Sequence, residues 1–438
     1  MNQSETLATE IVTKLRANGH VAYFVGGCVR DRLLGIDSKD FDVATDASPD
    51  AVEALFDRTE AVGKSFGVIL VKGADDVIEV ATFRQDLEYR DGRRPDAVVF
   101  TTSAEQDVQR RDFTINGLLW DPLADQLVDY VGGQADLDAK IIRAIGDPSA
   151  RFAEDKLRML RAVRFAARLG FTIEPETMRA IQEHAAGIDA VAPERIRQEI
   201  NRILTEGGAR RGFELLDESG LLAQILPEVR KLQGVEQPPQ YHPEGDVWTH
   251  TMIMIDGLEA GCSLTLALGV LLHDIGKPDT QTFAVDRIRF NGHVERGMEI
   301  AEEILTRLRY SRAEMDQAIA LIAGHMKFMH LRDMRESKLK RFLRQDRFEE
   351  HLELHRLDCT SSNGFLENWE YAGERFSELG EEKIRPRPLV TGNDLIAAGY
   401  KPGPEFREWL EAAEDAQLEG RIASTEEGLR LIEELVSR

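Results

Sequence analysis

The sequence predicts an α+β protein, with a mixed α/β region first and helices over the remainder. Two changes of pattern indicate this class. Before about residue 147, short apolar strands alternate with short helical segments and glycine-rich turns. Beyond residue 150, apolar residues recur at helical spacing almost without interruption. A chain of 438 residues is also too long for one ordinary core, so several domains are expected.

The first elements follow one another closely. An amphipathic helix is expected over residues 5–17, followed by the strand VAYFVGG and the helical segment VRDRLLG. Further strands are predicted at Phe41–Ala44, Gly67–Val71 and Val77–Thr82. The N-terminal region is therefore expected to contain a sheet with covering helices.

Long helices are predicted in the next region, at AEDKLRMLRAVRFAARLG, PETMRAIQEHAAG and PERIRQEINRILTEG. We place one domain boundary near Asp147–Pro148 and a second in Gln233–Gly245, which holds a Pro-Pro pair. The expected domains are residues 1–147, 148–232, 241–362 and 363–438.

The composition is that of a soluble globular protein. No apolar run approaches the roughly 20 residues needed to span a bilayer. The N-terminus lacks the basic opening and apolar stretch of a secretory signal. We therefore expect a cytoplasmic protein without a membrane partner. Three widely separated cysteines do not suggest a disulfide framework or a CxxC zinc site.

The formal net charge of −23 does not exclude a nucleic-acid partner, because arginines are clustered. The clusters lie at Arg84–Arg94, Arg110–Arg111 and Arg151–Arg168, whereas acidic residues concentrate after about Phe348. Such runs are also typical of solvated faces, so charge alone leaves both interpretations open.

Two aspartates in KDFDVAT suggest a metal site. Asp40 and Asp42 alternate along a predicted strand, so both carboxylates point to one face, and Phe41 points into the core. Upstream, Gly26 and Gly27 lie between a strand and a helix, where backbone N–H groups can approach a phosphate. Each feature alone is also found as surface decoration or a simple turn.

Glu79, in the strand VIEVATFR, is a candidate third carboxylate. The alternative is an edge-strand glutamate that faces water. Two Mg²⁺ ions held by such acids would activate a 3′-hydroxyl and stabilise the departing pyrophosphate.

Three motifs together resemble the class II tRNA nucleotidyltransferase and bacterial poly(A) polymerase family: VGGCVRDRLLGIDSKDFDVATDASP, RRDFTINGLLWDP and EDKLRMLRAVRFAARLGF. The resemblance covers about the first half of the chain. It implies a polymerase-β-like palm over residues 1–147 and a helical nucleotide-selecting, RNA-binding neck and body over residues 148–232. It further implies that Asp40 and Asp42 bind Mg²⁺, that Gly27 and Arg30 contact the nucleotide, and that Arg111 meets the triphosphate. The full nucleotide-binding set that it implies is Gly26, Gly27, Arg30, Arg110, Arg111, Asp112, Asn116, Asp155, Arg158, Arg161 and Arg164.

Asp155 and Arg158 have a physical interpretation of their own. They are three residues apart on a predicted helix and so share a face. A carboxylate accepts from an exocyclic amine and a guanidinium donates to a ring acceptor, an edge that cytosine and adenine offer and uracil and guanine do not. The alternative is a weak intrahelical salt bridge. Arg158, Arg161, Arg164 and Arg168 would also form a basic stripe for phosphate or RNA.

The members of this family differ in what they add. Poly(A) polymerases typically carry a segment like GRRFR where this chain has VGKSFGVIL, which favours a tRNA enzyme. The segment Glu88–Asp96 resembles a loop found in CCA-adding and A-adding members, which disfavours CC-only addition. We therefore expect CCA addition to tRNA from CTP and ATP, with A addition and poly(A) synthesis as alternatives.

A second site is expected in LALGVLLHDIGKP, where His273 and Asp274 lie in an apolar helix and need a partner that offsets desolvation. With His250 and Asp358 they resemble the ligand set of the HD phosphohydrolase domain. His293 and His325 fall where two-metal members have additional histidines. Imidazole and carboxylate ligands suit Mn, Fe, Ni, Co or Zn.

The resemblance implies a metal-dependent phosphatase or 2′,3′-cyclic phosphodiesterase at this second site, with Lys277 supporting the phosphate or capping its helix. A purely structural metal site is the alternative. The basic run Leu331–Arg347 fits RNA contact or a solvated helix face, and residues 363–438 resemble a family tail. Two other classes stay open: a signalling phosphohydrolase with a nucleotide-sensing first domain, and a non-catalytic RNA-binding module. The sequence does not indicate the oligomeric state.

Overall fold

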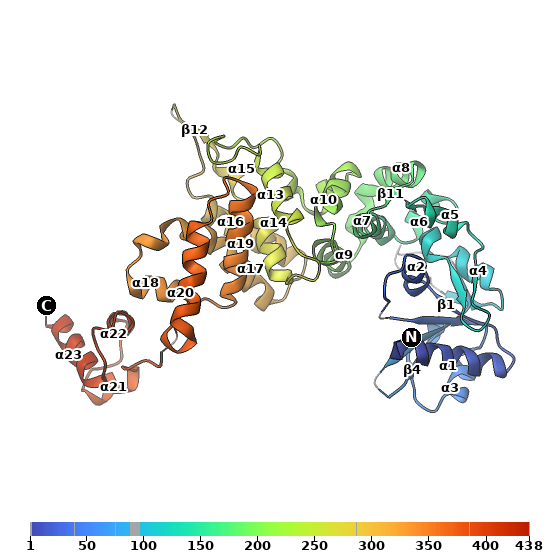
Figure 1. Ribbon diagram of the computed structural model, residues 1–438, viewed down its shortest axis with the longest axis horizontal. Coiled ribbons are helices and arrows are strands. Elements are labelled where there is room, and N and C mark those ends of the chain that lie inside the picture. The colour runs from blue at the N-terminus through green and yellow to red at the C-terminus, as the bar shows by residue number, and fades with distance from the viewer. Residues whose placement is uncertain are drawn as a thin grey trace. The chain divides into compact units, whose positions relative to one another are not determined.

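The computed structural model describes residues 2–38, 40–74, 76–87, 97–285, 287–384 and 386–437 (Figure 1). The chain divides into two compact units, Met1–Arg230 and Lys231–Arg438. No helix within the described ranges is both long and apolar enough to cross a bilayer. The segment Glu88–Asp96, singled out in the sequence, lies outside the described residues.

A seven-stranded sheet forms the centre of the first unit, in the order β3-β4-β5-β2-β1-β8-β9. Only β2 and β5 pair in parallel, and the other neighbours are antiparallel. The predicted strands 41–44, 67–71 and 77–82 correspond to β2, β4 and β5, whereas β3, β8 and β9 are too short or too exposed to show alternation. The strands are β1 (Ala22–Val25), β2 (Asp42–Thr45), β3 (Thr59–Gly63), β4 (Val68–Lys72), β5 (Val77–Thr82), β8 (Leu119–Asp121) and β9 (Gln126–Val128).

The helices α1 (Gln3–Ala17) and α3 (Pro49–Leu55) pack against the strands of this sheet (Figure 1). Strand alternation explains which side chains of β5 are covered, because Ile78 and Val80 are buried and Glu79 between them keeps exposed surface. In β2 the residues Val43, Ala44 and Thr45 are all buried, and the first residue, Asp42, keeps exposed surface. The exposed carboxylates therefore lie at the start of β2 and within β5.

The remainder of the first unit is mainly helical. Its short strands form two pairs, β6 (Arg84–Leu87) with β7 (Ala97–Phe100) and β10 (Ile141–Ile142) with β11 (Thr172–Ile173). Its helices are α2 (Gly27–Leu33), α4 (Ala104–Gln109), α5 (Gly133–Asp138), α6 (Pro148–Glu154), α7 (Leu157–Leu169), α8 (Pro175–His184), α9 (Pro193–Thr205), α10 (Ala209–Glu218), α11 (Leu221–Ile225) and α12 (Pro227–Arg230).

The stretch predicted as one helix from residue 153 is two helices, and that prediction is wrong at Asp155. This residue has extended backbone angles (φ −141°, ψ 103°) between α6 and α7. Its carboxylate accepts a hydrogen bond from the Leu157 amide at 3.0 Å. Such a local side-chain bond competes with helix continuation, so Asp155 and Arg158 do not occupy one continuous helix.

The arginines of α7 do not form an open basic stripe, which corrects the sequence expectation. Arg164 is almost completely buried and pairs with Glu199 at 2.7 Å. Arg161 pairs with Asp112, and Arg168 lies 3.8 Å from both Asp31 and Glu206. A buried guanidinium requires such partners because desolvation of an unpaired charge is costly. The arginines of α7 therefore tie it to neighbouring elements.

The second unit is also helical. The long helix α20 has a break in helical geometry at Gly380 (φ 61°). A short hairpin pairs β12 (Thr282–Phe283) with β13 (Ile288–Arg289). Its helices are α13 (Val247–Asp256), α14 (Leu264–Leu272), α15 (Lys277–Thr280), α16 (His293–Arg307), α17 (Arg312–Gly324), α18 (Glu336–Leu343), α19 (Phe348–Ser361), α20 (Glu367–Ile384), α21 (Gly392–Ala397), α22 (Glu405–Leu418) and α23 (Thr425–Val436).

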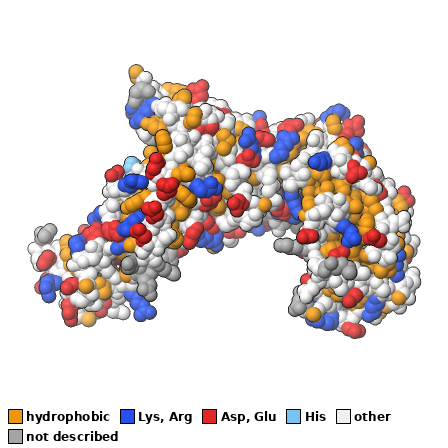
Figure 2. Space-filling model, viewed as in Figure 1, with side chains coloured by type: hydrophobic (Ala, Val, Ile, Leu, Met, Phe, Trp, Pro, Cys, Tyr) orange, Lys and Arg blue, Asp and Glu red, His pale blue; other side chains and the backbone are white. Residues whose placement is uncertain are grey.

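Part of the basic run Leu331–Arg347 pairs with acidic residues of this unit, and other basic side chains of the run, including Arg332 and Lys338, are exposed. Arg341 and Arg344 pair with Glu414 on α22, and Arg335 pairs with Asp415. These contacts join α18 to the acidic helix α22. On the face shown in Figure 2, acidic and basic side chains are interspersed over the coloured surface.

Candidate functional site

The parallel pairing of β2 with β5 brings two predicted carboxylates together. Asp42 and Glu79 are register partners on these neighbouring strands, and both keep exposed surface. Because β5 lies between β4 and β2, Glu79 is not on an edge strand. Asp40 precedes the first residue of β2, and Phe41 is buried against Phe24 with ring centroids 5.4 Å apart. The expected inward orientation of Phe41 is confirmed.

The diglycine turn lies beside this carboxylate pair. Val25, the last residue of β1, is the register partner of Asp42. Gly26 has φ +74°, a conformation that favours glycine. A Cβ atom at Gly26 would lie 3.8 Å from Arg111 Nη1 and 3.9 Å from Asp42 Oδ2. The turn, the carboxylate and the guanidinium therefore converge on one place.

Arg111 has one nitrogen that donates to a carboxylate and another that has no partner among the described residues. Its Nη2 donates to Asp107 Oδ2 at 3.0 Å, and Arg110 also pairs with Asp107. Burial raises the pKa of Asp107, but the charges of Arg111 and Arg110 outweigh it and lower the pKa. The buried Nε of Arg111 has no hydrogen-bond partner among the described residues. The Nη1 atom of the same guanidinium lies at the Gly26 turn beside Asp42, so this arginine fits an anionic ligand there.

The electrostatics of Asp42 fit a cation. Although part of the residue faces solvent, desolvation and then the charge of Glu79 raise the pKa of Asp42 to about 6, with Asp40 adding to this and Arg111 opposing it. Crowded carboxylates of this kind are the hard oxygen ligands that Mg²⁺ prefers. Asp40, Asp42 and Glu79 are therefore the residues suited to hold a divalent cation.

A buried polar network lies behind the diglycine turn. Arg30 donates to Asp31 at 2.6 and 2.8 Å and to Asn116 at 2.8 Å, and Asn116 donates to Asp112 at 3.1 Å. Asp112 also accepts from Arg161 at 2.8 Å. Arg30 is only 3% exposed, so the structure places it behind the site. A Cβ atom at Gly27 would lie 3.6 Å from Arg30 Nη2.

Asp155 and Arg158 have separate partners in the structure. Asp155 pairs with Arg195 at 3.0 Å. Arg158 donates to Glu154 at 2.8 Å and to the carbonyl of Arg110 at 2.9 Å. These pairs replace the intrahelical salt bridge that was the sequence alternative, and the Arg158 contact joins α7 to the residue before Arg111.

Three residues that contact the predicted site residues were not predicted from the sequence: Asp107, Glu154 and Arg195. Asp107 lies three and four residues before Arg110 and Arg111, and Glu154 lies four before Arg158, so helical spacing offered a signal for both. Arg195 is 40 residues from Asp155, and no local pattern reveals that contact.

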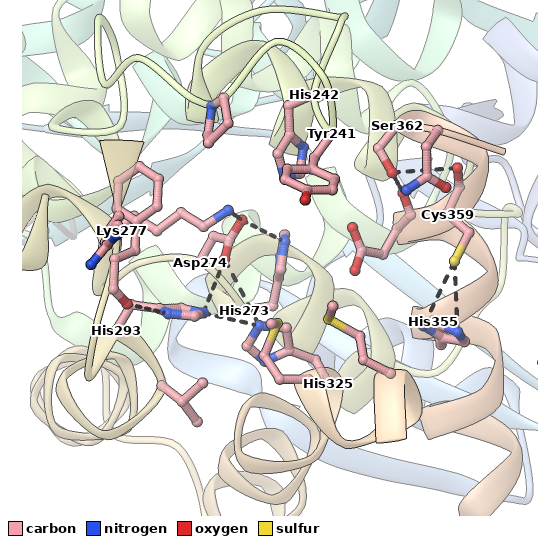
Figure 3. Close-up of a pocket in the computed structure, with 18 of the residues that line it drawn as sticks. Tyr241, His242, His273, Asp274, Lys277, His293, His325, His355, Cys359 and Ser362 are labelled. Carbon is pink, nitrogen blue, oxygen red and sulfur yellow. Dashed lines mark hydrogen bonds and ion pairs between the residues drawn. The ribbon is translucent and has the colours of Figure 1, made fainter. Parts of the chain in front are cut away.

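The second unit brings all six predicted HD-type ligands together. Two clusters of candidate donor atoms result, one of His250, His273 and Asp358 and the other of Asp274, His293 and His325. His250 Nε2 lies 3.2 Å from Asp358 Oδ1, and His273 Nε2 lies 3.1 Å from Asp274 Oδ2. In Figure 3 the labelled members of this set point toward one another at a cavity of about 860 Å³.

Backbone carbonyls hold the Nδ1 nitrogens of three of these histidine rings. The Nδ1 atoms of His273, His293 and His325 contact the carbonyls of Val270, Phe290 and Ile322 at 2.7–2.9 Å. A donor Nδ1–H leaves Nε2 with its lone pair free, which is the tautomer that binds metal. The arrangement therefore presents several Nε2 atoms to a common centre.

Two of these Nε2 atoms are buried without a hydrogen bond among the described residues, those of His250 and His273. Burial raises the pKa of Asp274, but His273 and Lys277 outweigh it, so the pKa lies well below its usual value. For Asp358, contact with His250 likewise outweighs burial and lowers the pKa. Ionised carboxylates beside unsatisfied imidazole nitrogens fit a divalent metal.

Lys277 also contacts this centre. Its Nζ lies 2.6 Å from Asp274 Oδ2 and donates to Gln237 at 2.7 Å. The sequence analysis did not single out two further residues here, His242 and Glu244, which contact each other and His250.

Three family models match successive parts of the chain. Residues 22–143 match the poly A polymerase head domain, residues 170–232 match the family described as "Probable RNA and SrmB- binding site of polymerase A", and residues 247–352 match the HD domain. The fold and the first site thus define a poly A polymerase-type head domain, joined to a helical RNA-binding region and an HD domain.

Curated relatives narrow this class. The chain is 41% identical over 314 residues to the multifunctional CCA protein of Halorhodospira halophila, which covers 69% of the chain and 73% of that protein. It is 41% identical over 261 residues to the CCA-adding enzyme of Bacillus subtilis, or 58% of the chain and 62% of that enzyme. It thus spans about three fifths of the length of such Bacillus relatives. The chain belongs to the CCA-adding enzyme family.

Solved structures agree with this assignment over the whole chain. The Bacillus stearothermophilus CCA-adding enzyme in complex with CTP has a TM-score of 0.76 and 27% identity, covering 100% of this chain and 99% of that one. The Thermotoga maritima CCA-adding enzyme complexed with tRNA has a TM-score of 0.61 and 20% identity, with 100% and 96% coverage, which supports the fold. The predicted fold class, a mixed α/β head followed by a helical body, HD domain and tail, is confirmed.

Asp112 gives a pH-dependent test of the network behind the site. Burial raises its pKa, but Arg161, Asn116 and a backbone amide outweigh this and lower the pKa to about 2, from 3.8. The resulting stabilisation is complete above pH 3.8 and is lost as pH falls through about 2. We expect Asp112→Asn to lower the free energy of unfolding by about 2 kcal/mol at pH 7.

Urea unfolding of both proteins between pH 2 and 7 measures this difference, with exposed Asp57→Asn as the matched control. The difference between wild type and Asp112→Asn should shrink below pH 4. A difference that stays constant down to pH 2 would contradict the network.

Proposed function

We propose that this protein is an RNA 3′-end nucleotidyltransferase that adds CCA to tRNA from CTP and ATP. The observation that carries the proposal is the convergence of Asp42, Glu79, Gly26 and the guanidinium of Arg111. Relatives named as CCA-adding enzymes, including structures with CTP and with tRNA, support the same activity.

The residues of the first site have distinct proposed roles. Asp40, Asp42 and Glu79 would hold Mg²⁺, which when bound favours the ionised 3′-hydroxyl and the departing pyrophosphate. Arg111 would donate its free Nε to the triphosphate, and Gly26 lets the backbone approach it. Because Arg30 is buried against Asp31 and Asn116, its role is to hold the diglycine turn. Arg110, Asp112 and Asn116 support Arg111 and this turn.

Asp155 and Arg158 would select the base. The carboxylate accepts from the exocyclic amine of cytosine or adenine, and the guanidinium donates to the adjacent ring nitrogen. In the structure both groups are ionic and held by Arg195 and Glu154. Binding therefore involves exchange of these internal partners for the base, while Arg161 and Arg164 anchor α7 behind them.

Two observations bear on which nucleotides are added. The segment that distinguishes poly(A) polymerases forms β3 and the 3₁₀ turn Lys64–Phe66 here, with the sequence VGKSFG. Other members of the family named among the relatives are CCA-adding enzymes. A-only addition and poly(A) synthesis are the alternatives that the acceptor experiment below distinguishes.

Asp42, a proposed Mg²⁺ ligand, gives a direct test of this function. Purified protein should add CC and then A to tRNA transcripts that end before CCA, and only A to transcripts that end at CC. Asp42→Ala should reduce incorporation of α-labelled CTP and ATP by at least about 10³-fold, because loss of one metal ligand removes transition-state charge stabilisation. Exposed Asp57→Ala should retain wild-type incorporation.

Addition of A alone to every transcript would reassign the enzyme as A-adding. A long poly(A) product would assign a poly(A) polymerase. Full incorporation by Asp42→Ala would exclude Asp42 from the reaction. No incorporation by the wild-type protein would leave a nucleotide-sensing or RNA-binding first unit.

The second prediction concerns nucleotide choice. Asp155→Ala should lose about tenfold to hundredfold of the discrimination against UTP and GTP, since one base contact contributes about 1–3 kcal/mol. Steady-state kcat/KM for all four NTPs on one transcript provides the measurement. Asp189→Ala, an exposed change in the same unit, should leave the ratios unaltered. Unchanged preference for CTP and ATP in Asp155→Ala would exclude this carboxylate from selection.

A second activity is favoured by the HD-type cluster. We propose that His250, His273, Asp274 and Asp358 hold a divalent transition metal, with His293 and His325 available for a second. When bound, such a metal makes hydroxide available near neutral pH. The buried, unsatisfied Nε2 atoms of His250 and His273 support metal binding, and the cavity beside them gives access for a phosphate ester.

The third prediction tests this activity. Protein supplemented with Mn²⁺, Ni²⁺ or Co²⁺ should hydrolyse 2′,3′-cyclic AMP, and His273→Ala should reduce this hydrolysis by at least about 10²-fold through loss of a metal ligand. The same variant should add nucleotides to tRNA at the wild-type rate. Hydrolysis that persists in His273→Ala would assign it elsewhere, and metal binding without hydrolysis would indicate a structural site.

A further inference from the structure

One metal-site histidine differs from the others in what holds its outer nitrogen. His273, His293 and His325 use backbone carbonyls. His250 Nδ1 instead contacts a side-chain carboxylate, Glu244 Oε1, at 2.7 Å. His250 is fully buried, and its Nδ1 also lies 3.4 Å from Ser361 Oγ, so Glu244 makes the shorter of two side-chain contacts to this nitrogen.

Glu244 holds two imidazoles with one oxygen. Its Oε1 also lies 2.9 Å from Nδ1 of His242, and the His242 and His250 rings meet edge to face with centroids 5.0 Å apart. The carboxylate is 7% exposed. One nearly buried carboxylate oxygen therefore accepts from two imidazole rings, and its carboxylate has little contact with water.

The local chain geometry brings Glu244 to His250. Asp246 caps α13 by accepting from the Thr249 amide at 2.8 Å, which fixes the helix that carries His250. Gly245 has φ +130°, in the region that favours glycine, and a Cβ there would lie 3.7 Å from Thr249. This turn directs the chain before α13 back over the first turn of the helix, where Glu244 reaches His250.

Glu244 also forms a third group of candidate donor atoms with His242 and His250. In this structure its Oε1 contacts the Nδ1 atoms of both rings directly, at hydrogen-bond distances of 2.9 and 2.7 Å. The free nitrogen of His250 is Nε2, which is buried without a hydrogen bond and lies 3.2 Å from Asp358 Oδ1.

We propose that Glu244 is a positioning residue that orients His250, and increases the electron density of its ring, for metal binding in the HD-type cluster. A carboxylate on the outer nitrogen fixes the Nδ1–H tautomer and makes Nε2 a stronger donor. The inference rests on the proposed metal site in this cluster. It concerns the affinity and geometry of that site rather than the reaction performed there.

Co²⁺ binding to the full-length protein tests this role, with excess Mg²⁺ present to occupy the carboxylate site of the first unit. Glu244→Gln should weaken the Co²⁺ Kd about 10- to 100-fold and change the visible absorption spectrum of bound Co²⁺. Exposed Glu303→Gln, which also removes one charge from α16, should match wild type. Unaltered tRNA nucleotide addition and circular dichroism report that the variants are folded.

A double-mutant comparison shows whether Glu244 acts through His250. If it does, Glu244→Gln should add little to the weakening caused by His250→Ala. Wild-type Kd and spectrum in Glu244→Gln, or a full additional loss in the double variant, would overturn the proposal. Glu244→Asp provides the same comparison if Glu244→Gln does not fold. Absence of Co²⁺ binding in wild type would instead contradict the proposed metal site.

Discussion

The parallel pairing of β2 with β5 is the constraint on which the first site depends. It places Asp42 beside Glu79 on the exposed side of the pleat, while the intervening apolar residues are buried under helices. The antiparallel pairing of β1 with β2 then brings the turn at Gly26 to the same carboxylate. A shift of one residue in the β2 register would reverse this and bury the acids. The strand pairing that builds the core therefore also brings the carboxylates of Asp42 and Glu79 together.

A buried network of charged and polar side chains lies behind this site. Behind the carboxylates, Arg30, Asp31, Asn116, Asp112 and Arg161 satisfy one another in a buried network. Burial of ions is unfavourable unless each is paired and hydrogen-bonded, and a single deletion leaves its partner uncompensated. Such a network fixes one geometry for the turn and for α7. Arg111 is less fully satisfied, because its buried Nε has no partner among the described residues, as is also the case for Arg16 and Arg151.

The sequence predicted the parts of this arrangement that depend on local pattern. Strand alternation identified β2, β4 and β5 and the inward position of Phe41, and the HD-type motif identified six side chains that meet in space. Contacts between distant residues were not accessible. The burial of Arg164 against Glu199, and the pairing of Asp155 with Arg195, depend on how α9 packs on α7. The break at Asp155 depends on one side-chain hydrogen bond that helical periodicity does not reveal.

The two candidate sites offer different types of ligand to a divalent cation. In the first unit, burial and then neighbouring carboxylates raise the pKa of Asp42, and carboxylate oxygens suit a hard cation. In the second, histidines with held outer nitrogens and ionised aspartates suit a transition metal. Glu244 contacts the Nδ1 atom of one of these histidines, His250. Each unit thus carries a set of ligands matched to its own proposed phosphate chemistry.

A crystal structure of the protein with CTP and Mn²⁺ in place of Mg²⁺ tests the central claim most directly. Anomalous scattering should place Mn²⁺ in contact with the Asp40 and Asp42 carboxylates, with the triphosphate beside Gly26 and hydrogen-bonded to Arg111 Nε. A triphosphate bound elsewhere, or Asp40 and Asp42 turned away from the metal, would contradict the account.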